Sequence, residues 1–106
     1  MINSKRKGKL GELEWCEKVR AYGFDCVRGV QYRGMPGSPD TVSEQLSAYH
    51  FEVKRRQTSG FYLWMAQAER EGAGKIPVVA HRKDHGQWHV FLKADDFLEL
   101  IKASQT

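Results

Sequence analysis

The chain has 106 residues and a formal net charge of +4 at pH 7, with 41% hydrophobic and 28% charged residues. This length supports one hydrophobic core, so we expect a single domain over residues 1–106 and no second one. No apolar run is long enough to cross a bilayer, and the basic N-terminal stretch leads into acidic residues rather than an apolar signal core. We therefore expect a cytoplasmic protein without a membrane partner.

The pattern of apolar, glycine and proline residues divides the chain into alternating helices and strands. In chain order, the predicted segments are a helix at 4–22, strands at 24–30, 41–42 and 49–54, a helix at 61–72, strands at 76–82 and 87–92, and a helix at 93–103. The stretch 31–40 predicts a loop, and a short turn joins the last two strands as a hairpin. The order α-β-β-β-α-β-β-α predicts an α/β fold with a mixed central β-sheet flanked by helices.

An ionisable residue lies within the apolar stripe of the first helix. At about 100° per residue, Trp15, Cys16, Val19 and Tyr22 fall on one side, and Glu12 lies near the middle of that side. A carboxylate in an apolar stripe is costly unless something compensates it. Two interpretations stay open: Glu12 lies beyond the core edge in water, or it faces a polar cleft at the end of the sheet.

The strand at 49–54 carries charged side chains on one face. Residues two apart in a strand share a face, so Glu52 and Lys54 project together with His50, opposite Phe51. By itself, such a pattern favours a half-exposed strand whose polar face meets water, with His50 at an exposed edge. The alternative is that Glu52 and Lys54 face a metal ion and a phosphate.

A second carboxylate, Asp40, follows a proline and directly precedes the short strand at 41–42. Magnesium prefers hard oxygen ligands and keeps several waters, so one or two carboxylates and a substrate phosphate suffice to hold it. Asp40, Glu52 and the backbone carbonyl of Val53 offer such oxygens, and Glu12 would bind through water or support a second ion. Lys54 then has two open roles: it helps to deprotonate the attacking water, or it stabilises negative charge that develops on the phosphate.

These residues resemble a known active-site signature. "PD" at 39–40 followed by "EVK" at 52–54 is similar to the motif of the PD-(D/E)xK nuclease superfamily. The opening "KGKLGELEWCEKVRAYGFDCVRG" resembles the start of archaeal-type and phage-encoded Holliday junction resolvases. The resemblance implies a restriction-endonuclease-like fold, a homodimer and Mg²⁺ as cofactor, with Mn²⁺ expected to substitute. The residues that it implies for catalysis are Glu12, Asp40, Glu52 and Lys54.

Further site residues follow from the resemblance and from the basic clusters. Arg28 matches an arginine that contacts DNA or assists catalysis in such resolvases, while Ser38 and Gln67 match positions that border the site. Clustered basic side chains favour a polyanionic partner, here DNA. The residues that we predict to contact DNA are Lys5, Arg6, Lys7, Lys9, Arg28, Arg33, Arg55 and Arg56.

The sequence therefore predicts a Mg²⁺-dependent DNA endonuclease, and most specifically a Holliday junction resolvase. By the resemblance, it would leave 5′-phosphate and 3′-hydroxyl ends. A nicking or restriction-like nuclease of another substrate preference is the alternative within the enzyme class. A non-catalytic DNA-binding module with a nuclease-like fold, or a plain interaction domain, is the alternative outside it.

The cysteines and several tryptophans are open to more than one interpretation. Cys16 and Cys26 are expected to be small buried thiols rather than a disulfide. Trp64, Met65 and Trp88 could supply an apolar patch for a dimer, but core packing explains them at least as well.

Three histidines, His81, His85 and His89, recur at every fourth residue. On a helix, this spacing would place three imidazoles on one side as a possible zinc site. Because the predicted hairpin runs through this segment, we expect it to scatter them.

Overall fold

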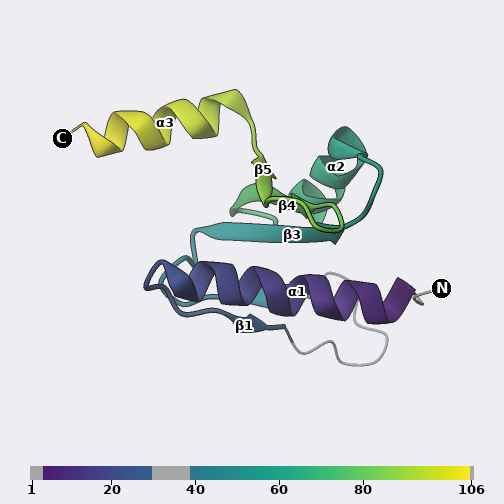
Figure 1. The fold of residues 1–106 in the computed structure, drawn as a ribbon. Coiled ribbons are helices and arrows are strands. Elements are labelled where there is room, and N and C mark those ends of the chain that lie inside the picture. Colours follow the sequence, from purple (N-terminus) through teal and green to yellow (C-terminus); the bar gives the residue numbers. More distant parts are fainter. Residues whose placement is uncertain (1–3, 30–38, 106) are drawn as a thin grey trace.

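Two helices pack against opposite faces of a small β-sheet, and a third helix leads away from it (Figure 1). The structure, a computed structural model, describes residues 4–29 and 39–105, and of residues 4–6 only the backbone. Its elements are α1 (Ser4–Ala21), β1 (Val27–Arg28), β2 (Thr41–Val42), β3 (Tyr49–Arg55), α2 (Phe61–Glu71), β4 (Ile76–Arg82), β5 (His89–Phe91) and α3 (Ala94–Ser104). The predicted element order and the α/β class are confirmed.

Strand β4 is the centre of a three-stranded mixed sheet. β3 runs parallel to it, from the pair Tyr49 and Ile76 to the pair Arg55 and Arg82. β5 runs antiparallel to it, which is the predicted hairpin. Residues 77–81 of β4 are all buried, as expected for a strand covered on both faces.

β1 and β2 pair antiparallel in a separate two-stranded sheet. The strand predicted at 24–30, whose last residue lies outside the described part, is reduced to Val27–Arg28 because Asp25 is engaged elsewhere. The Asp25 carboxylate accepts hydrogen bonds from Ser43 Oγ and from the backbone N–H of Gln45. In return, the backbone N–H of Asp25 donates to Gln45 Oε1 at 2.7 Å. These bonds hold the turn after β2 and use a donor that a longer β1 would need.

The main hydrophobic core lies between α1 and the sheet. Its buried members are Trp15, Cys16, Val19, Cys26, Val53 and Ala80. Trp15 contacts Phe51 of β3 and Trp88, with ring centroids 5.4 Å and 5.1 Å apart. The prediction for Tyr22 is wrong, because this residue is 72% exposed. Helix α1 ends at Ala21, so the helical period no longer directs Tyr22 toward the core.

The two cysteines are free, buried thiols, as the sequence predicts. Their Sγ atoms lie 3.4 Å apart. Burial, together with the neighbouring Cys26 thiol, raises the pKa of Cys16 to about 12. Cys16 therefore stays protonated and packs as a small apolar group.

Helix α2 covers the other face of the sheet. Met65 and Ala68 are buried in this layer, and Trp64 packs on His81 with ring centroids 5.1 Å apart. Trp88, the third apolar residue considered for a dimer patch, packs on the other side of the sheet against the main core.

Both helices approach β3 through a glycine. A Cβ atom on Gly11 of α1 would lie 2.7 Å from Arg55 Cβ, and one on Gly72, at the end of α2, would lie 2.4 Å from His50 Cβ. Real Cβ atoms do not come that close, so these two glycines set the distance between each helix and the strand.

Helix α3 projects away from the sheet and has no buried residue (Figure 1). The large apolar side chains that it exposes are Phe97, Leu98, Leu100 and Ile101. Within the described ranges, no helix has the length and apolar character needed to cross a membrane.

Candidate active site

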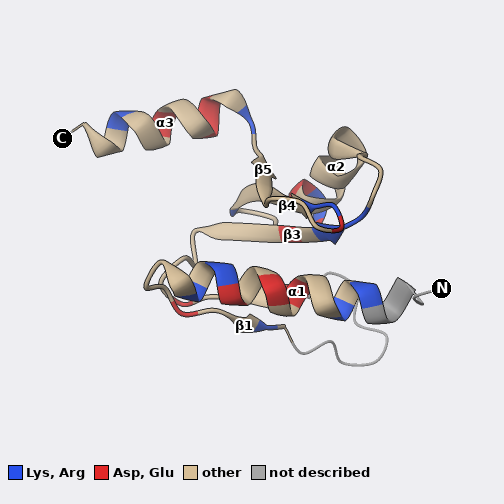
Figure 2. Ribbon diagram, in the orientation of Figure 1, with Lys and Arg blue, Asp and Glu red and all other residues tan. Residues whose placement is uncertain are grey.

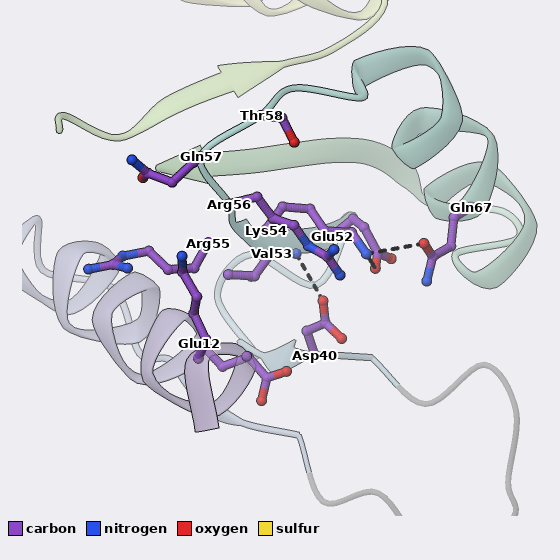
Figure 3. A pocket seen from close by; sticks show the side chains of 12 residues that line it. Glu12, Asp40, Glu52, Val53, Lys54, Arg55, Arg56, Gln57, Thr58 and Gln67 are labelled. Atoms are coloured by element: carbon purple, nitrogen blue, oxygen red, sulfur yellow. Dashed lines mark hydrogen bonds and ion pairs between the residues drawn. The ribbon is translucent and has the colours of Figure 1, made fainter. Parts of the chain in front are cut away.

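A cavity of about 400 Å³ opens between α1, β3 and α2 (Figure 3). The residues that line it are Lys7, Gly8, Glu12, Asp40, Glu52, Val53, Lys54, Arg55, Arg56, Gln57, Thr58 and Gln67. The four residues predicted to carry catalysis are all in this set, although they come from a helix, a loop and a strand. The fold therefore brings the predicted motif together in one place.

The polar face of β3 is buried rather than wet. Glu52 is only 2% exposed and His50 only 5% exposed. The interpretation of this strand as half-exposed, with His50 at an open edge, is therefore wrong. The reason is tertiary: α2 lies over this face, and Gly72 lets the helix end come close to His50. A buried carboxylate requires compensating partners.

Asp40 lies against β3. Its Oδ2 accepts a hydrogen bond from the backbone N–H of Val53 at 2.9 Å, which is drawn in Figure 3. Burial, the negative charge of Glu52 and, more weakly, that of Glu12 raise the pKa of Asp40 to about 7. Carboxylates held this close to one another repel unless a proton or a cation lies near them.

Glu52 keeps its charge although it is the most buried acid of the site. Burial alone would raise its pKa, but the His50 imidazole and the Lys54 ammonium outweigh burial and leave that pKa below its usual range. In the absence of a cation, Asp40 rather than Glu52 therefore holds a proton below about pH 7.

Glu12 faces the cavity from α1, and its side chain is 15% exposed. It forms an ion pair with Arg28 of β1, with Nε and Oε1 2.7 Å apart. Of the two interpretations of Glu12, the structure supports the polar cleft and not the open water beyond the core. It also brings the predicted Arg28 into contact with the site.

Lys54 reaches toward α2. Its Nζ lies 3.6 Å from Glu52 Oε2 and donates a hydrogen bond to Gln67 Oε1 at 3.2 Å (Figure 3). Gln67 Nε2 in turn donates to Glu71 Oε1 at 3.2 Å. Gln67, predicted as a border residue, thus fixes the ammonium group beside the carboxylates.

Basic residues gather at the end of the molecule where this cavity opens (Figure 2). Arg56 is exposed there. Arg55 is instead engaged with acids, at 3.1 Å from Glu14 and in contact with Asp84. Lys7 also lies 3.5 Å from Asp84. With Arg28, which pairs with Glu12, three of the predicted DNA-contacting groups already have acidic partners.

The remaining predicted residues do not enter this geometry. Lys9 is exposed on α1 and does not line the cavity. Lys5 and Arg6 belong to α1, but their side chains lie outside the described part of the chain, as do Arg33 and Ser38 altogether.

One residue of the site region was missed from the sequence. Among the described residues, the group of potential metal ligands whose atoms lie within 4.8 Å of one another is His50, Glu52 and Glu71. The predicted set of Glu12, Asp40 and Glu52 does not meet that spacing. The missed residue is Glu71, and the sequence gives only a weak signal for it. Glu71 follows Gln67 at i+4, so the two side chains share a helix face.

The histidine repeat is arranged differently from both interpretations. The β4–β5 register makes His81 and His89 direct cross-strand partners, so the hairpin does not scatter these two. His81 is buried, and its Nε2 lies 2.8 Å from the carbonyl oxygen of Arg56. No group of potential metal ligands among the described residues includes these histidines.

Comparison with known proteins gives no further assignment: no family model, curated protein or solved structure matches this chain significantly. The arguments for function come from the residues of the cavity and from the sequence motif.

Proposed function

We propose that this protein is a Mg²⁺-dependent DNA endonuclease with a restriction-endonuclease-like fold, and most specifically a Holliday junction resolvase. One observation carries the proposal: the Asp40 carboxylate is hydrogen-bonded to β3 at Val53, between Glu52 and Lys54. Residues of the sequence pattern "PD…ExK" thus line a single cavity with Glu12. A buried, mutually repelling set of acids beside a lysine stabilises no fold by itself, and such arrangements are typical of functional sites.

The donor set suits magnesium. Asp40, Glu52 and the carbonyl of Val53 offer hard oxygens, and the raised pKa of Asp40 indicates a carboxylate group that a divalent cation would relieve. Glu12 would act through water, in agreement with its wider spacing. When bound, Mg²⁺ supplies a water of lowered pKa and neutralises charge on the phosphate. Mn²⁺, with similar oxygen preferences, should substitute.

The side chains of this site then have distinct roles in attack on a phosphodiester. Lys54, held by Glu52 and Gln67, places its ammonium group at the cavity, where it stabilises negative charge that develops on the phosphate. Its ion-pair distance to Glu52 supports this role over that of a base. Arg28 orients Glu12, and Arg56 offers a free cation to the DNA backbone. The products would carry 5′-phosphate and 3′-hydroxyl ends.

A symmetric pair of cuts in a junction requires two sites, so the proposal includes a homodimer. Of the residues first considered for its interface, Met65 is buried, Trp64 packs on His81 and Trp88 packs against the main core. The exposed apolar side chains of α3 offer a surface for the second copy instead. Light scattering should give twice the monomer mass, and replacement of Phe97 and Ile101 by serine should return the mass to that of one chain.

The proposal is tested by cleavage of a four-way junction, a linear duplex, a single strand and a flap in the presence of Mg²⁺. The wild-type protein should cut the junction fastest, and Asp40→Asn should cut none of them. Glu17→Gln, at an exposed carboxylate of the same helix as Glu12, is the matched control and should keep full activity. If the protein cut junction and duplex at equal rates, it would be a nicking or restriction-like nuclease and not a resolvase.

The same Asp40→Asn variant distinguishes the proposed nuclease from a non-catalytic DNA-binding module. In a nuclease, the variant loses cleavage and binds DNA as well as or better than wild type, since one acid that repels phosphate is removed. Cleavage that persists unchanged in Asp40→Asn would refute the mechanism. Binding without cleavage by the wild-type protein under Mg²⁺ or Mn²⁺ would establish the binding module.

A further inference from the structure

A second polar cluster lies on the side of Glu52 that faces away from Lys54. It consists of His50, two residues before Glu52 on β3, Glu52 itself, and Glu71 in the last turn of α2. One ligand atom from each residue lies within 4.8 Å of the others. Neither His50 nor Glu71 lines the catalytic cavity, so the two sites share only Glu52.

Two atoms of this cluster are buried without a partner. His50 Nε2 and Glu52 Oε1 are 3.6 Å apart, which is too far for a hydrogen bond. Neither atom has a hydrogen-bond partner among the described residues, and both side chains are more than nine-tenths buried. Buried polar atoms in folded proteins are almost always satisfied. A species bound between them would satisfy both at once.

The charges of the cluster indicate the sign of that species. Glu52 and Glu71 place two carboxylates beside one imidazole. Ligand atoms of the two acids lie within 4.8 Å of each other, so their negative charges repel. The Lys54 ammonium group pairs with the other oxygen of Glu52, Oε2, so it does not neutralise the charge on the side of His50 and Glu71. A cation is therefore the species that the cluster favours.

We propose that His50, Glu52 and Glu71 form a second divalent-cation site, which shares only Glu52 with the proposed Mg²⁺ site and takes an imidazole-binding ion of the Zn²⁺ type. Proteins bind Zn²⁺ through histidine nitrogen and through Asp or Glu oxygen, and three such ligands leave a fourth position open to water. Magnesium should bind this cluster weakly, because it prefers oxygen ligands and an octahedral shell. The inference does not rest on the proposed nuclease activity, since cation binding requires no DNA.

The surroundings hold two of the three ligands in place. Gln67 Nε2 donates to Glu71 Oε1 at 3.2 Å, which fixes that carboxylate from the neighbouring helical turn. Gly72 allows the end of α2 to contact His50. A bound ion would join α2 to β3, and it would hold Glu52 Oε1 so that Oε2 stays directed at Lys54. The second site would thus position the carboxylate that the catalytic cavity uses.

The test uses the full chain, freed of metal with a chelator and titrated with Co²⁺ as a visible probe for zinc sites. The wild-type protein should bind Co²⁺ with ligand-field absorption bands, and Zn²⁺ should displace it while excess Mg²⁺ should not. Loss of an outer hydrogen-bond partner weakens metal sites by roughly 10–100-fold, so loss of a ligand should cost at least about 100-fold. Glu71→Gln and His50→Gln should both show this loss.

Three controls keep the result decisive. Asp40→Asn removes a ligand of the Mg²⁺ site only and should keep the Co²⁺ bands. His89→Gln removes an exposed imidazole and should keep them as well. If circular dichroism shows that His50→Gln does not fold, Glu71→Gln, at a half-buried helix end, decides alone.

The inference is overturned if Co²⁺ does not bind, if its bands persist in Glu71→Gln, or if Asp40→Asn abolishes them. A protein that binds Co²⁺ as expected but cleaves no DNA would refute the proposed function and leave this inference intact. A protein that cleaves DNA with Mg²⁺ and binds no Co²⁺ at this cluster would do the reverse.

Discussion

The two faces of β3 are both buried, and they are built from opposite chemistry. Toward α1, Phe51 and Val53 pack in the hydrophobic core. Toward α2, His50, Glu52 and Lys54 lie in a polar layer, where Glu52 is less exposed than Val53, at 2% against 9%. One seven-residue strand thus carries an apolar and a charged interior.

The difference teaches what each face contributes. Apolar burial stabilises the fold by about 25 cal/mol per Å². Buried charges do not, because their desolvation offsets their attraction. A charged face that is buried as completely as a hydrophobic one therefore fits the proposed activity better than a purely structural role. Substitutions on the α1 face should cost stability, and substitutions on the α2 face should cost activity.

Glu52→Gln tests the charged face and should have the largest effect. The change keeps the size of the side chain and removes the charge that holds Lys54 and, by our proposal, the cation. A metal contributes several kcal/mol of transition-state stabilisation, so cleavage in single-turnover assays should fall by roughly 1,000-fold or more. The far-ultraviolet circular dichroism should be unchanged. Activity within tenfold of wild type would remove Glu52 from the mechanism.

Trp15→Ala tests the apolar face. Trp15 is buried and contacts Phe51 and Trp88. Removing a buried tryptophan side chain costs about 3–5 kcal/mol of unfolding free energy. Urea denaturation should measure this loss, and the fraction that remains folded should cleave DNA at the wild-type rate. A loss below about 1 kcal/mol would mean that this core is not the main source of stability.

Asp40→Asn should change how stability depends on pH. The pKa of Asp40 is about 7 in the folded protein against 3.8 in the unfolded chain. Its contribution to stability is therefore full below about pH 4 and is lost as pH rises through 7. Asparagine does not ionise, so the variant should be more stable than wild type at pH 8 without metal, by about 4 kcal/mol. Urea titrations with chelator at pH 5 and pH 8 measure the difference.

Asp25→Asn is the control of opposite sign. Hydrogen bonds from the backbone N–H groups of Gln45 and Glu44 lower the pKa of Asp25. Its contribution is present above the unfolded pKa of about 4 and is lost as pH falls through the folded value. This variant should be less stable than wild type at pH 8. If both variants are less stable than wild type at pH 8, the interpretation that burial and neighbouring charges raise the pKa of Asp40 is wrong.

Local patterns explain what could be predicted from the sequence. Helical period identified Trp15, Cys16 and Val19 as core, and strand alternation identified Glu52 and Lys54 as one face. These features depend on a few neighbouring residues, so they are visible without a fold. The element order followed from the same patterns and the turn residues between them.

The burial of His50 and the approach of Glu71 could not be predicted in this way. Both depend on how closely the end of α2 lies to β3, which Gly72 permits and which no periodicity encodes. Alternation alone cannot distinguish a polar face in water from one under a helix. The prediction that Tyr22 lies in the core was wrong because the helical period was extended one residue beyond Ala21, where the helix ends.

Two glycines of α1 give the smallest and most closely matched test, which addresses the distance between the helix and β3. Alanine at either position improves helix propensity by up to about 1 kcal/mol. At Gly8, nothing lies within 4 Å of the added methyl group, so Gly8→Ala should show that gain. At Gly11, the methyl group would lie 2.7 Å from Arg55 Cβ, an atom fixed to the strand backbone. Gly11→Ala should therefore lose about 1–3 kcal/mol.

The propensity gain is common to both variants, so the difference between them in urea denaturation measures the clash alone. Arg55 is also held by Glu14 of the same helix, at 3.1 Å, so a shift of α1 would strain that ion pair as well. The helix therefore cannot relax freely away from β3. If the two alanine variants proved equally stable, α1 would lie farther from β3 than this structure has it. Glu12 would then be farther from Asp40 and Glu52, and it would no longer belong to the candidate active site.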